Sequence, residues 1–467
     1  MPEPRMWQLT AGSAVLGLAL AAVAVTAAGP WDSGQRTAER ARAAAPQAGG
    51  ARHSPAPAPP APRLPAPAPS APGVLTALHA PAPATRAADL AAVLVPLLAD
   101  PGLGPLRTAS VVDTATGTQL YGEGEGTPMT PASTVKIATV AAALSALGPD
   151  HRIPTTVTAT PDGTTVTLVG GGDPTLDPAR LKALAADTAR ALKKRGTTSV
   201  RLAYDTHLYQ GAELHPIGPN ENLAPVVALM TREGRLDDSA SGPAPRTADP
   251  AGDTATAFAG LLTGAGITVT GDPAPGRAPK AAPLARTYSA PLADLVERTL
   301  THSDNDLAEA LARQTALARK QPASFDGAGR AVRDELGRLG LPVTGARFAD
   351  GSGLDRRDRV SAALLTGLLT RAADPARPTL RPLLTGLPVG GFTGTLAGRF
   401  DTAPARSGAG LVRAKTGTLT GVNTLAGTVV TADGRLLAFA FLAGRTTSPY
   451  EAQPALDRLS AALAGPR

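Results

Sequence analysis

The sequence predicts an α+β fold in which an antiparallel sheet is flanked by helices and is interrupted in sequence by an inserted smaller domain. Residues 108–122 have the pattern of a β-hairpin, and β-branched and apolar strands return at 411–444. The stretches between them show mostly helical periodicity. Strands at both ends of the folded part predict that the two ends share one sheet.

The individual elements follow from local patterns. Apolar residues at helical spacing predict helices at 87–98, 133–147, 179–195, 291–317, 328–340, 360–373 and 450–464. Runs rich in Val, Thr and Leu beside turn residues predict strands within 108–122, 155–170, 198–205, 411–417, 423–431 and 435–444. The last two strands flank an Asp433-Gly434 turn, which is typical of a hairpin.

The chain divides into four predicted parts. Arg5 precedes the apolar run 9–28, so residues 1–30 are expected to be an export signal or a membrane anchor. Residues 31–84 are rich in Pro and Ala and are expected to form a disordered tether. The short strands and frequent Gly and Pro of 156–283 indicate the inserted domain, and 85–155 with 284–467 form the main domain. The folded part is therefore expected on the extracytoplasmic side of the membrane, anchored or secreted, with membrane contact only through the N-terminal segment.

Composition excludes several classes of protein. The 467 residues contain no Cys, which rules out a disulfide scaffold, a thiolate metal site and a cysteine enzyme. The net charge is +7, but there is no polybasic run and only 3% of the residues are aromatic, so no nucleic-acid partner is expected. The six His show no His-Glu-x-x-His spacing, and neither a metal nor another cofactor is predicted.

Two residues of the first chemical motif, Ser133-Thr134-Val135-Lys136, are expected to act together. Positions i and i+3 lie on the same face of a helix, so Lys136 is placed beside Ser133 at a helix N-terminus. A hydroxyl is a poor nucleophile until a neighbour takes its proton, and a buried Lys beside another cation is neutral enough to do so. Ser133 is therefore the predicted acylated nucleophile and Lys136 its base.

Two further motifs complete the predicted site. Ser303 and Asn305 lie two apart before a helix, where they are expected to relay a proton and hold a substrate amide. Lys415, Thr416 and Gly417 lie near the end of a strand, with Gly417 leaving room for a ligand backbone. The amide groups of Ser133 and of the next strand residue, Thr418, are expected to face an oxyanion.

With these three motifs the chain resembles the penicillin-binding proteins and serine β-lactamases. It is most similar to the low-molecular-mass class C penicillin-binding proteins, the D-alanyl-D-alanine carboxypeptidase/endopeptidases. The matching stretches are MTPASTVKIAT, LVGGGDPTL, THSDNDLAEAL, ADGSGLDR and VRAKTGTLTGVNTLAG, which together cover most of the chain from about residue 85 onward. The resemblance implies a β-lactamase/transpeptidase-like fold with the insertion between the first and second motifs.

The resemblance also implies the reaction and its partners. The substrate would be a peptidoglycan stem peptide or cross-link, cleaved after its penultimate D-Ala through an acyl-enzyme, and β-lactams would acylate the same serine. Ser303 and Lys415 would be the proton-relay pair, Asn305 the amide anchor, and Thr416 and Thr418 contacts to the substrate carboxylate and oxyanion. Arg356 would either meet a carboxylate of the stem peptide or remain an exposed turn residue.

Two alternatives remain beside the peptidase. A β-lactam-binding sensor and a catalytically silent wall scaffold would both keep this fold. A β-lactamase is disfavoured: no Asn lies between Asn305 and Asn423, so the Glu-x-x-x-Asn element of class A enzymes is missing, and no Asn has Tyr two residues before it, as class C enzymes require.

Overall fold

The computed structural model describes residues 87–465, which belong to one compact unit. Its strands are β1 (Leu106–Asp113), β2 (Gln119–Glu123), β3 (Pro154–Ala159), β4 (Thr165–Val169), β5 (Ser199–Asp205), β6 (Thr268–Val269), β7 (Ala274–Pro275), β8 (Ala285–Tyr288), β9 (Val412–Leu419), β10 (Val422–Val430) and β11 (Leu436–Gly444). Its α-helices are α3 (Ala87–Leu98), α4 (Val135–Leu147), α5 (Pro178–Lys194), α6 (Pro250–Gly264), α7 (Leu292–Thr301), α8 (Asn305–Ala318), α9 (Phe325–Arg338), α10 (Ala362–Ala373), α11 (Arg381–Thr385) and α12 (Pro449–Ala462).

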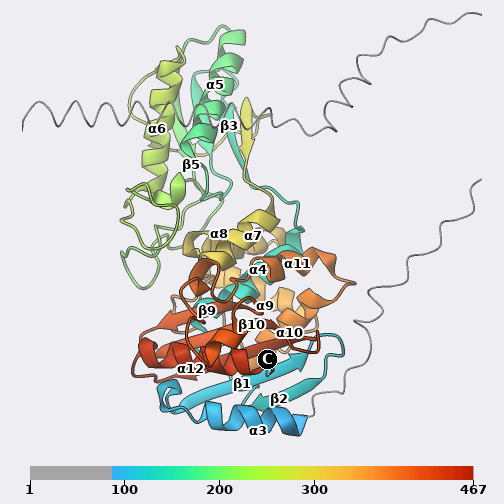
Figure 1. Ribbon diagram of the computed structural model, residues 1–467. Helices are drawn as coiled ribbons and strands as arrows, with labels where there is room; N and C mark the ends of the chain where they lie inside the picture. Colours follow the sequence, from blue (N-terminus) through green and yellow to red (C-terminus); the bar gives the residue numbers. More distant parts are fainter. Residues whose placement is uncertain (1–86, 466–467) are drawn as a thin grey trace, which may run out of the picture. The chain divides into compact units, whose positions relative to one another are not determined.

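The two ends of the described chain share one antiparallel sheet, as the sequence predicts. Its strand order is β2-β1-β11-β10-β9, and β1 pairs with β11 from Leu106 opposite Gly444 to Asp113 opposite Leu437 (Figure 1). This pairing brings the hairpin near the start of the domain beside the C-terminal strands. The third motif lies on β9, the edge strand of this sheet.

Helices cover both faces of this sheet. Successive residues of a strand point to opposite faces, and β11 follows this rule. Ala438 and Ala440 pack in a core with α4, α8, α9 and α10, whereas Phe439 and Phe441 pack in a second core with α3 and α12. The first of these cores holds α4, so the helix that follows Ser133 is buried between the sheet and other helices.

A second, mixed sheet lies within residues 154–288. Its strands run in the order β6-β5-β4-β3-β8, with β7 pairing β5, and α5 and α6 share a core with it. The strands extend past both predicted limits of the inserted domain, 156 and 283, and those limits stay a prediction.

One helix, α6, was not predicted. Its glycines and threonines are poor helix formers, but Asp249 caps it, Pro250 starts it, and burial of Phe258 and Leu262 stabilises it. The helical stretch 291–317 forms two helices, α7 and α8, and Ser303 lies between them, before the second helix, as expected.

No helix of residues 87–465 combines the length and apolar character that crossing a membrane requires. The predicted signal or anchor (1–30) and the predicted tether (31–84) lie outside the described residues.

Candidate active site

Ser133 lies on a short 3-10 turn, η3 (Ala132–Thr134), and α4 begins two residues later at Val135. Two hydroxyls fix this turn by donating to the carbonyl of Pro131, that of Thr134 at 2.7 Å and that of Thr424 on β10 at 2.8 Å. Ala132 has φ 48°, a left-handed conformation that is uncommon outside glycine. Ser133, the predicted nucleophile, is therefore held in a constrained turn between α4 and the sheet.

Lys136 is fully buried, and its Nζ has three polar neighbours. Nζ donates to Asn305 Oδ1 at 2.7 Å and to the carbonyl of Ser352 at 2.6 Å, and it lies 3.1 Å from Ser133 Oγ. A neutral amine has two hydrogens and one lone pair. The two acceptors use both hydrogens, so the lone pair is left for the hydroxyl hydrogen of Ser133. This is the geometry that a general base requires.

The charge state of Lys136 suits the same role. Burial lowers the pKa of Lys136 to about 8, against the opposing attraction of Asp350 and other nearby carboxylates. At pH 7 about one-tenth of such a group is neutral, compared with about 0.03% at the ordinary lysine pKa. Burial thus raises the fraction of usable base by about 300-fold.

Asn305, the first residue of α8, is oriented from both ends of its amide. Its Oδ1 accepts from Lys136, and its Nδ2 donates to the carbonyl of Asn222 at 3.0 Å. The middle residue of the motif, Asp304, caps α8 by accepting from the Leu307 amide. The carbonyl of Asn222 thereby determines which end of the Asn305 amide faces the lysine.

Ser303 occupies the turn between α7 and α8 with φ 58°. The expected position of Ser303 before a helix is confirmed, since α8 begins two residues later at Asn305. His302, the residue before Ser303, is the C-terminal cap of α7, and both residues line the pocket.

The pocket that Ser133 lines has a volume of about 200 Å³. It brings together Ser133, Ser303, Asn305 and Thr418 from the three motifs. Its other lining residues are Asn222, Arg235, Ser241, Gly242, Pro243, Arg246, His302, Asp304 and Leu354. Residues 222–246 thus form one wall of the site, and no sequence motif had indicated this.

Lys415 on β9 is fully buried, and its Nζ donates to the carbonyl of Thr416 at 2.9 Å. Burial, and then the positive charge of Lys136, lower the pKa of Lys415 well below its ordinary value. The charge on Lys136 therefore disfavours a second charge on Lys415. No hydrogen bond joins Ser303 to either lysine in the described part of the chain, so the relay through Ser303 stays a prediction.

Of the residues that follow Lys415, Thr416 and Gly417 contact other parts of the protein, whereas Thr418 is exposed to the pocket. Thr416 Oγ1 is 2.9 Å from Thr395 Oγ1, and Thr418 is exposed on the pocket wall. A Cβ on Gly417 would lie 2.1 Å from Thr424 Oγ1 and 2.6 Å from the carbonyl oxygen of Pro131. Gly417 therefore makes room for the turn that carries Ser133, whereas the sequence analysis assigned that room to a ligand.

Arg356 lies outside this pocket. Its Nη2 donates to the carbonyl of Thr420 at 2.8 Å, and it lines a separate hollow of about 370 Å³ together with Arg359 and Arg445. Its contact with a substrate carboxylate stays a prediction.

Three buried carboxylates, Glu233, Asp304 and Asp306, lie close enough together to hold a cation. Arginines already neutralise them: Arg298 pairs with Glu233 and Asp304, and Arg246 pairs with Asp306 at 3.0 Å. This cluster supports the turn that carries Ser303 and Asn305.

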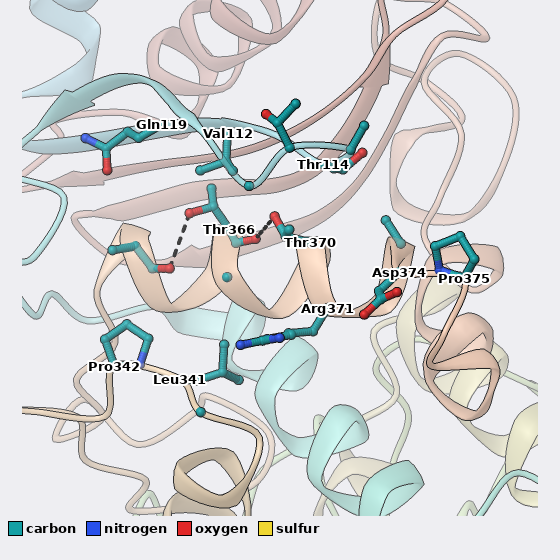
Figure 2. A pocket seen from close by; sticks show the side chains of 17 residues that line it. Val112, Thr114, Gln119, Leu341, Pro342, Thr366, Thr370, Arg371, Asp374 and Pro375 are labelled. Atoms are coloured by element: carbon teal, nitrogen blue, oxygen red, sulfur yellow. Dashed lines mark hydrogen bonds between the residues drawn. The ribbon is translucent and has the colours of Figure 1, made fainter.

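A larger hollow of about 830 Å³ lies between the β1–β2 turn and α10 (Figure 2). Thr366 and Thr370 of α10 face Val112, Thr114 and Gln119 across it. None of its lining residues is a predicted site residue.

An antiparallel sheet covered by helices, with a serine and a buried lysine at the start of a central helix beside its edge strand, is a β-lactamase/transpeptidase-like fold. Residues 90–241 and 236–463 match the D-Ala-D-Ala carboxypeptidase 3 (S13) family, and the chain belongs to that family.

Similar proteins agree with this assignment. The chain is 37% identical over 408 residues to carboxypeptidase DacB of Mycolicibacterium smegmatis, covering 84% of this chain and 87% of that protein. It is 29% identical over 442 residues to a D-alanyl-D-alanine carboxypeptidase of an Actinomadura species, covering 76% and 81%. The crystal structure of penicillin binding protein 4 (dacB) from Haemophilus influenzae matches with TM-score 0.65 at 23% identity over 81% of this chain and 98% of that one, which shows the fold.

Proposed function

We propose that this chain is a serine D-Ala-D-Ala carboxypeptidase and endopeptidase that cleaves peptidoglycan stem peptides and cross-links. The observation that carries the proposal is the contact set of Lys136 Nζ, because two fixed acceptors leave its lone pair for Ser133. Membership in the family and the carboxypeptidase names of its relatives support the substrate class.

In the acylation step, Ser133 Oγ attacks the carbonyl carbon of the penultimate D-Ala while its proton passes to Lys136. Backbone amides of Ser133 and Thr418 stabilise the negative charge that develops on the carbonyl oxygen. The C–N bond then breaks, and the leaving amine takes a proton from Lys136, relayed by the hydroxyl of Ser303. The products are free D-Ala, or a cross-bridge amine in the endopeptidase reaction, and an ester on Ser133.

In the deacylation step, water adds to the ester carbonyl as Lys136 takes its proton, and the same proton returns to Ser133 Oγ as the ester bond breaks. A β-lactam acylates Ser133 by the same first step, but its leaving nitrogen stays attached to the acyl group. Burial lowers the pKa of both lysines, which favours the neutral amine that both steps need at Lys136.

We further propose that the protein acts outside the cytoplasm. The apolar run 9–28 and the Pro- and Ala-rich residues 31–84 support this location, with the first segment serving as a cleaved signal or a retained anchor.

The test is hydrolysis of a stem pentapeptide ending in D-Ala-D-Ala and of a cross-linked muropeptide dimer, followed by chromatography. Release of D-Ala and of monomers by the wild type, but not by Ser133→Ala, is the expected result. β-Lactam binding without cleavage of either substrate would favour a sensor, and the absence of both would favour a silent scaffold.

A further inference from the structure

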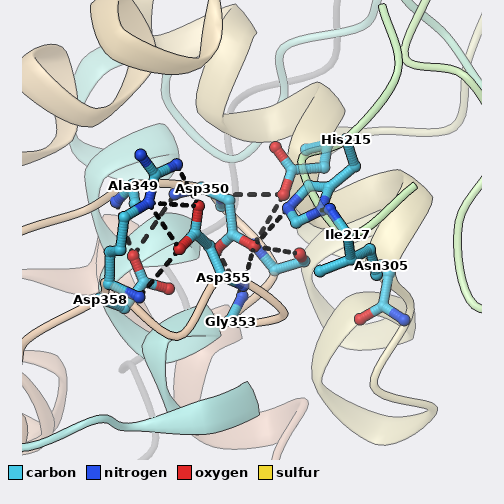
Figure 3. A network of polar contacts seen from close by, with 12 residues as sticks. His215, Ile217, Asn305, Ala349, Asp350, Gly353, Asp355 and Asp358 are labelled. Carbon is cyan, nitrogen blue, oxygen red and sulfur yellow. Dashed lines mark hydrogen bonds and ion pairs between the residues drawn. The ribbon is translucent and has the colours of Figure 1, made fainter.

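His215 is a buried histidine on the loop that leaves β5, and it meets the main domain at Asp350 (Figure 3). Its Nε2 is 2.9 Å from Asp350 Oδ2, and both side chains are almost completely excluded from solvent. The backbone amide of Ile217 donates to His215 Nδ1 at 3.2 Å. Because Nδ1 accepts that hydrogen bond, Nε2 carries the imidazole hydrogen and donates it to Asp350.

Asp350 in turn organises the loop that touches the catalytic lysine. Its carboxylate accepts from the Ser352 hydroxyl at 3.0 Å and from the amides of Gly353 and Asp355 at 2.7 and 2.8 Å. Glu309 accepts from the amides of residues 351 and 352, both at 3.0 Å. The three successive amides of 351–353 are thus bonded to two buried carboxylates, and this fixes the direction of the Ser352 carbonyl.

The loop also packs against the nucleophile turn. Gly353 has φ 86°, and a Cβ there would lie 2.1 Å from the carbonyl oxygen of Ala132, the residue before Ser133. The Ser352 carbonyl is 2.6 Å from Lys136 Nζ. A small movement of this loop would therefore change the surroundings of both the base and the nucleophile.

The other charged groups near His215 are accounted for. The ring of Phe325 packs edge-on against the imidazole, at 80° and with centroids 5.4 Å apart. On this ring lies the guanidinium of Arg313, 4.2 Å from the centroid, and Arg313 pairs with Glu309 at 3.1 Å. Burial lowers the pKa of His215, whereas Asp350, Glu309 and Asp355 raise it above its ordinary value. A proton on Nδ1 would break the bond from the Ile217 amide.

Asp350 and neighbouring charged groups also determine the electrostatic field at Lys136. Burial raises the pKa of Asp350, but the bonds from His215 and other donors outweigh it and hold the pKa well below its ordinary value. Burial and the charge of Asp350 raise the pKa of Asp358 well above its ordinary value. The carboxyl groups that act on Lys136 are Asp350, Glu309, Asp304 and Asp358, and the charge of Lys136 in turn acts on Lys415.

We propose that His215 is a positioning residue for the general base: by donating to Asp350, it holds the Ser352 carbonyl against Lys136 Nζ and keeps water away from that amine. The inference rests on the proposed function, since it concerns the base of that reaction. With this role, the loop after β5 contributes to the active site twice, through the side chain of His215 and through the carbonyl of Asn222.

The effect of removing the imidazole has a definite sign. Burial is the main cause of the low pKa of Lys136. His215→Ala frees the 351–353 loop and admits water, so the pKa of Lys136 rises toward its ordinary value and less neutral base is present at pH 7. The acid limb of the acylation profile should move up by at least about half a pH unit, and the rate at pH 7 should therefore fall by about threefold or more.

The experiment measures the second-order rate of penicillin acylation by the full chain between pH 6 and 10 for four proteins. They are the wild type, His215→Ala, His215→Gln and His207→Ala. Glutamine keeps an N–H donor near the position of Nε2, so it should restore the wild-type limb. His207 is the matched control because it also pairs with an aspartate, Asp205 at 2.9 Å, but is exposed to solvent.

The outcomes separate this inference from the proposed function. A wild type that is not acylated would overturn the proposed function. If the wild type is acylated but the acid limb of the pH profile of His215→Ala lies at the wild-type pH, only the role of His215 would be overturned. This holds even if the acylation rate and the Tm of His215→Ala fall together. The expected result is an acid limb that moves to higher pH in His215→Ala and stays at the wild-type pH in His215→Gln and in His207→Ala.

Discussion

Replacing Lys136 by arginine keeps a positive charge but should nearly stop acylation, because arginine cannot supply a neutral nitrogen. The pKa of Lys136 is about 8, so about one-tenth of the lysine is neutral at pH 7. An arginine with a pKa above about 12 is neutral in fewer than about one molecule in 10⁵. The usable base falls at least about 10⁴-fold, and since general bases typically contribute about 10²–10⁴ in rate, the acylation rate should fall by about 10²–10⁴.

The assay is the second-order rate of labelling by a fluorescent penicillin between pH 6 and 10. The wild-type rate should rise with pH to a midpoint near 8, since deprotonation creates the base. Lys182→Arg, on the exposed face of α5, is the matched control and should keep the wild-type profile. Acylation of Lys136→Arg at a rate close to that of the wild type would refute the assignment of the base.

Two further substitutions test the packing around the site. Gly417→Ala should lower acylation at least tenfold, because the new Cβ would come within 2.6 Å of the backbone of the nucleophile turn; Gly260→Ala, with open space around it on α6, should leave acylation unchanged. Wild-type acylation by Gly417→Ala would show that the turn moves freely. Glu309→Ala should lower the free energy of unfolding by about 3–5 kcal/mol in urea titrations, because it leaves Arg313 buried without its ion-pair partner. Asp187→Ala, which breaks an exposed pair with Arg190, should lower it by less than about 1 kcal/mol. Equal losses for these two variants would contradict the buried-pair account.

Much of the catalytic domain could be predicted because its signals are local. The Ser133–Lys136 contact follows from helical spacing, and the shared sheet follows from strand patterns at the two ends of the folded part. Helix α6 could not be predicted from propensity, because burial of Phe258 and Leu262 against the second sheet outweighs its weak helix formers.

The remaining parts of the site depend on contacts between distant residues. The carbonyls of Asn222 and Ser352 meet Asn305 and Lys136 across 83 and 216 positions, and backbone carbonyls carry no sequence signature. Only the family resemblance of ADGSGLDR, residues 349–356, marked the loop that carries the second of them. The orientation of His215 toward Asp350 is equally invisible in the sequence, since it depends on how the loop after β5 packs.

The central claim is that Ser133 is the acylated nucleophile. The most direct measurement is peptide mass spectrometry of the purified chain after incubation with penicillin, alongside Ser133→Ala, with release of D-Ala from a stem peptide followed in the same preparations. The account predicts one adduct, on the peptide that contains Ser133, and loss of both the adduct and D-Ala release in Ser133→Ala. An adduct on another residue, or D-Ala release that persists in Ser133→Ala, would contradict it.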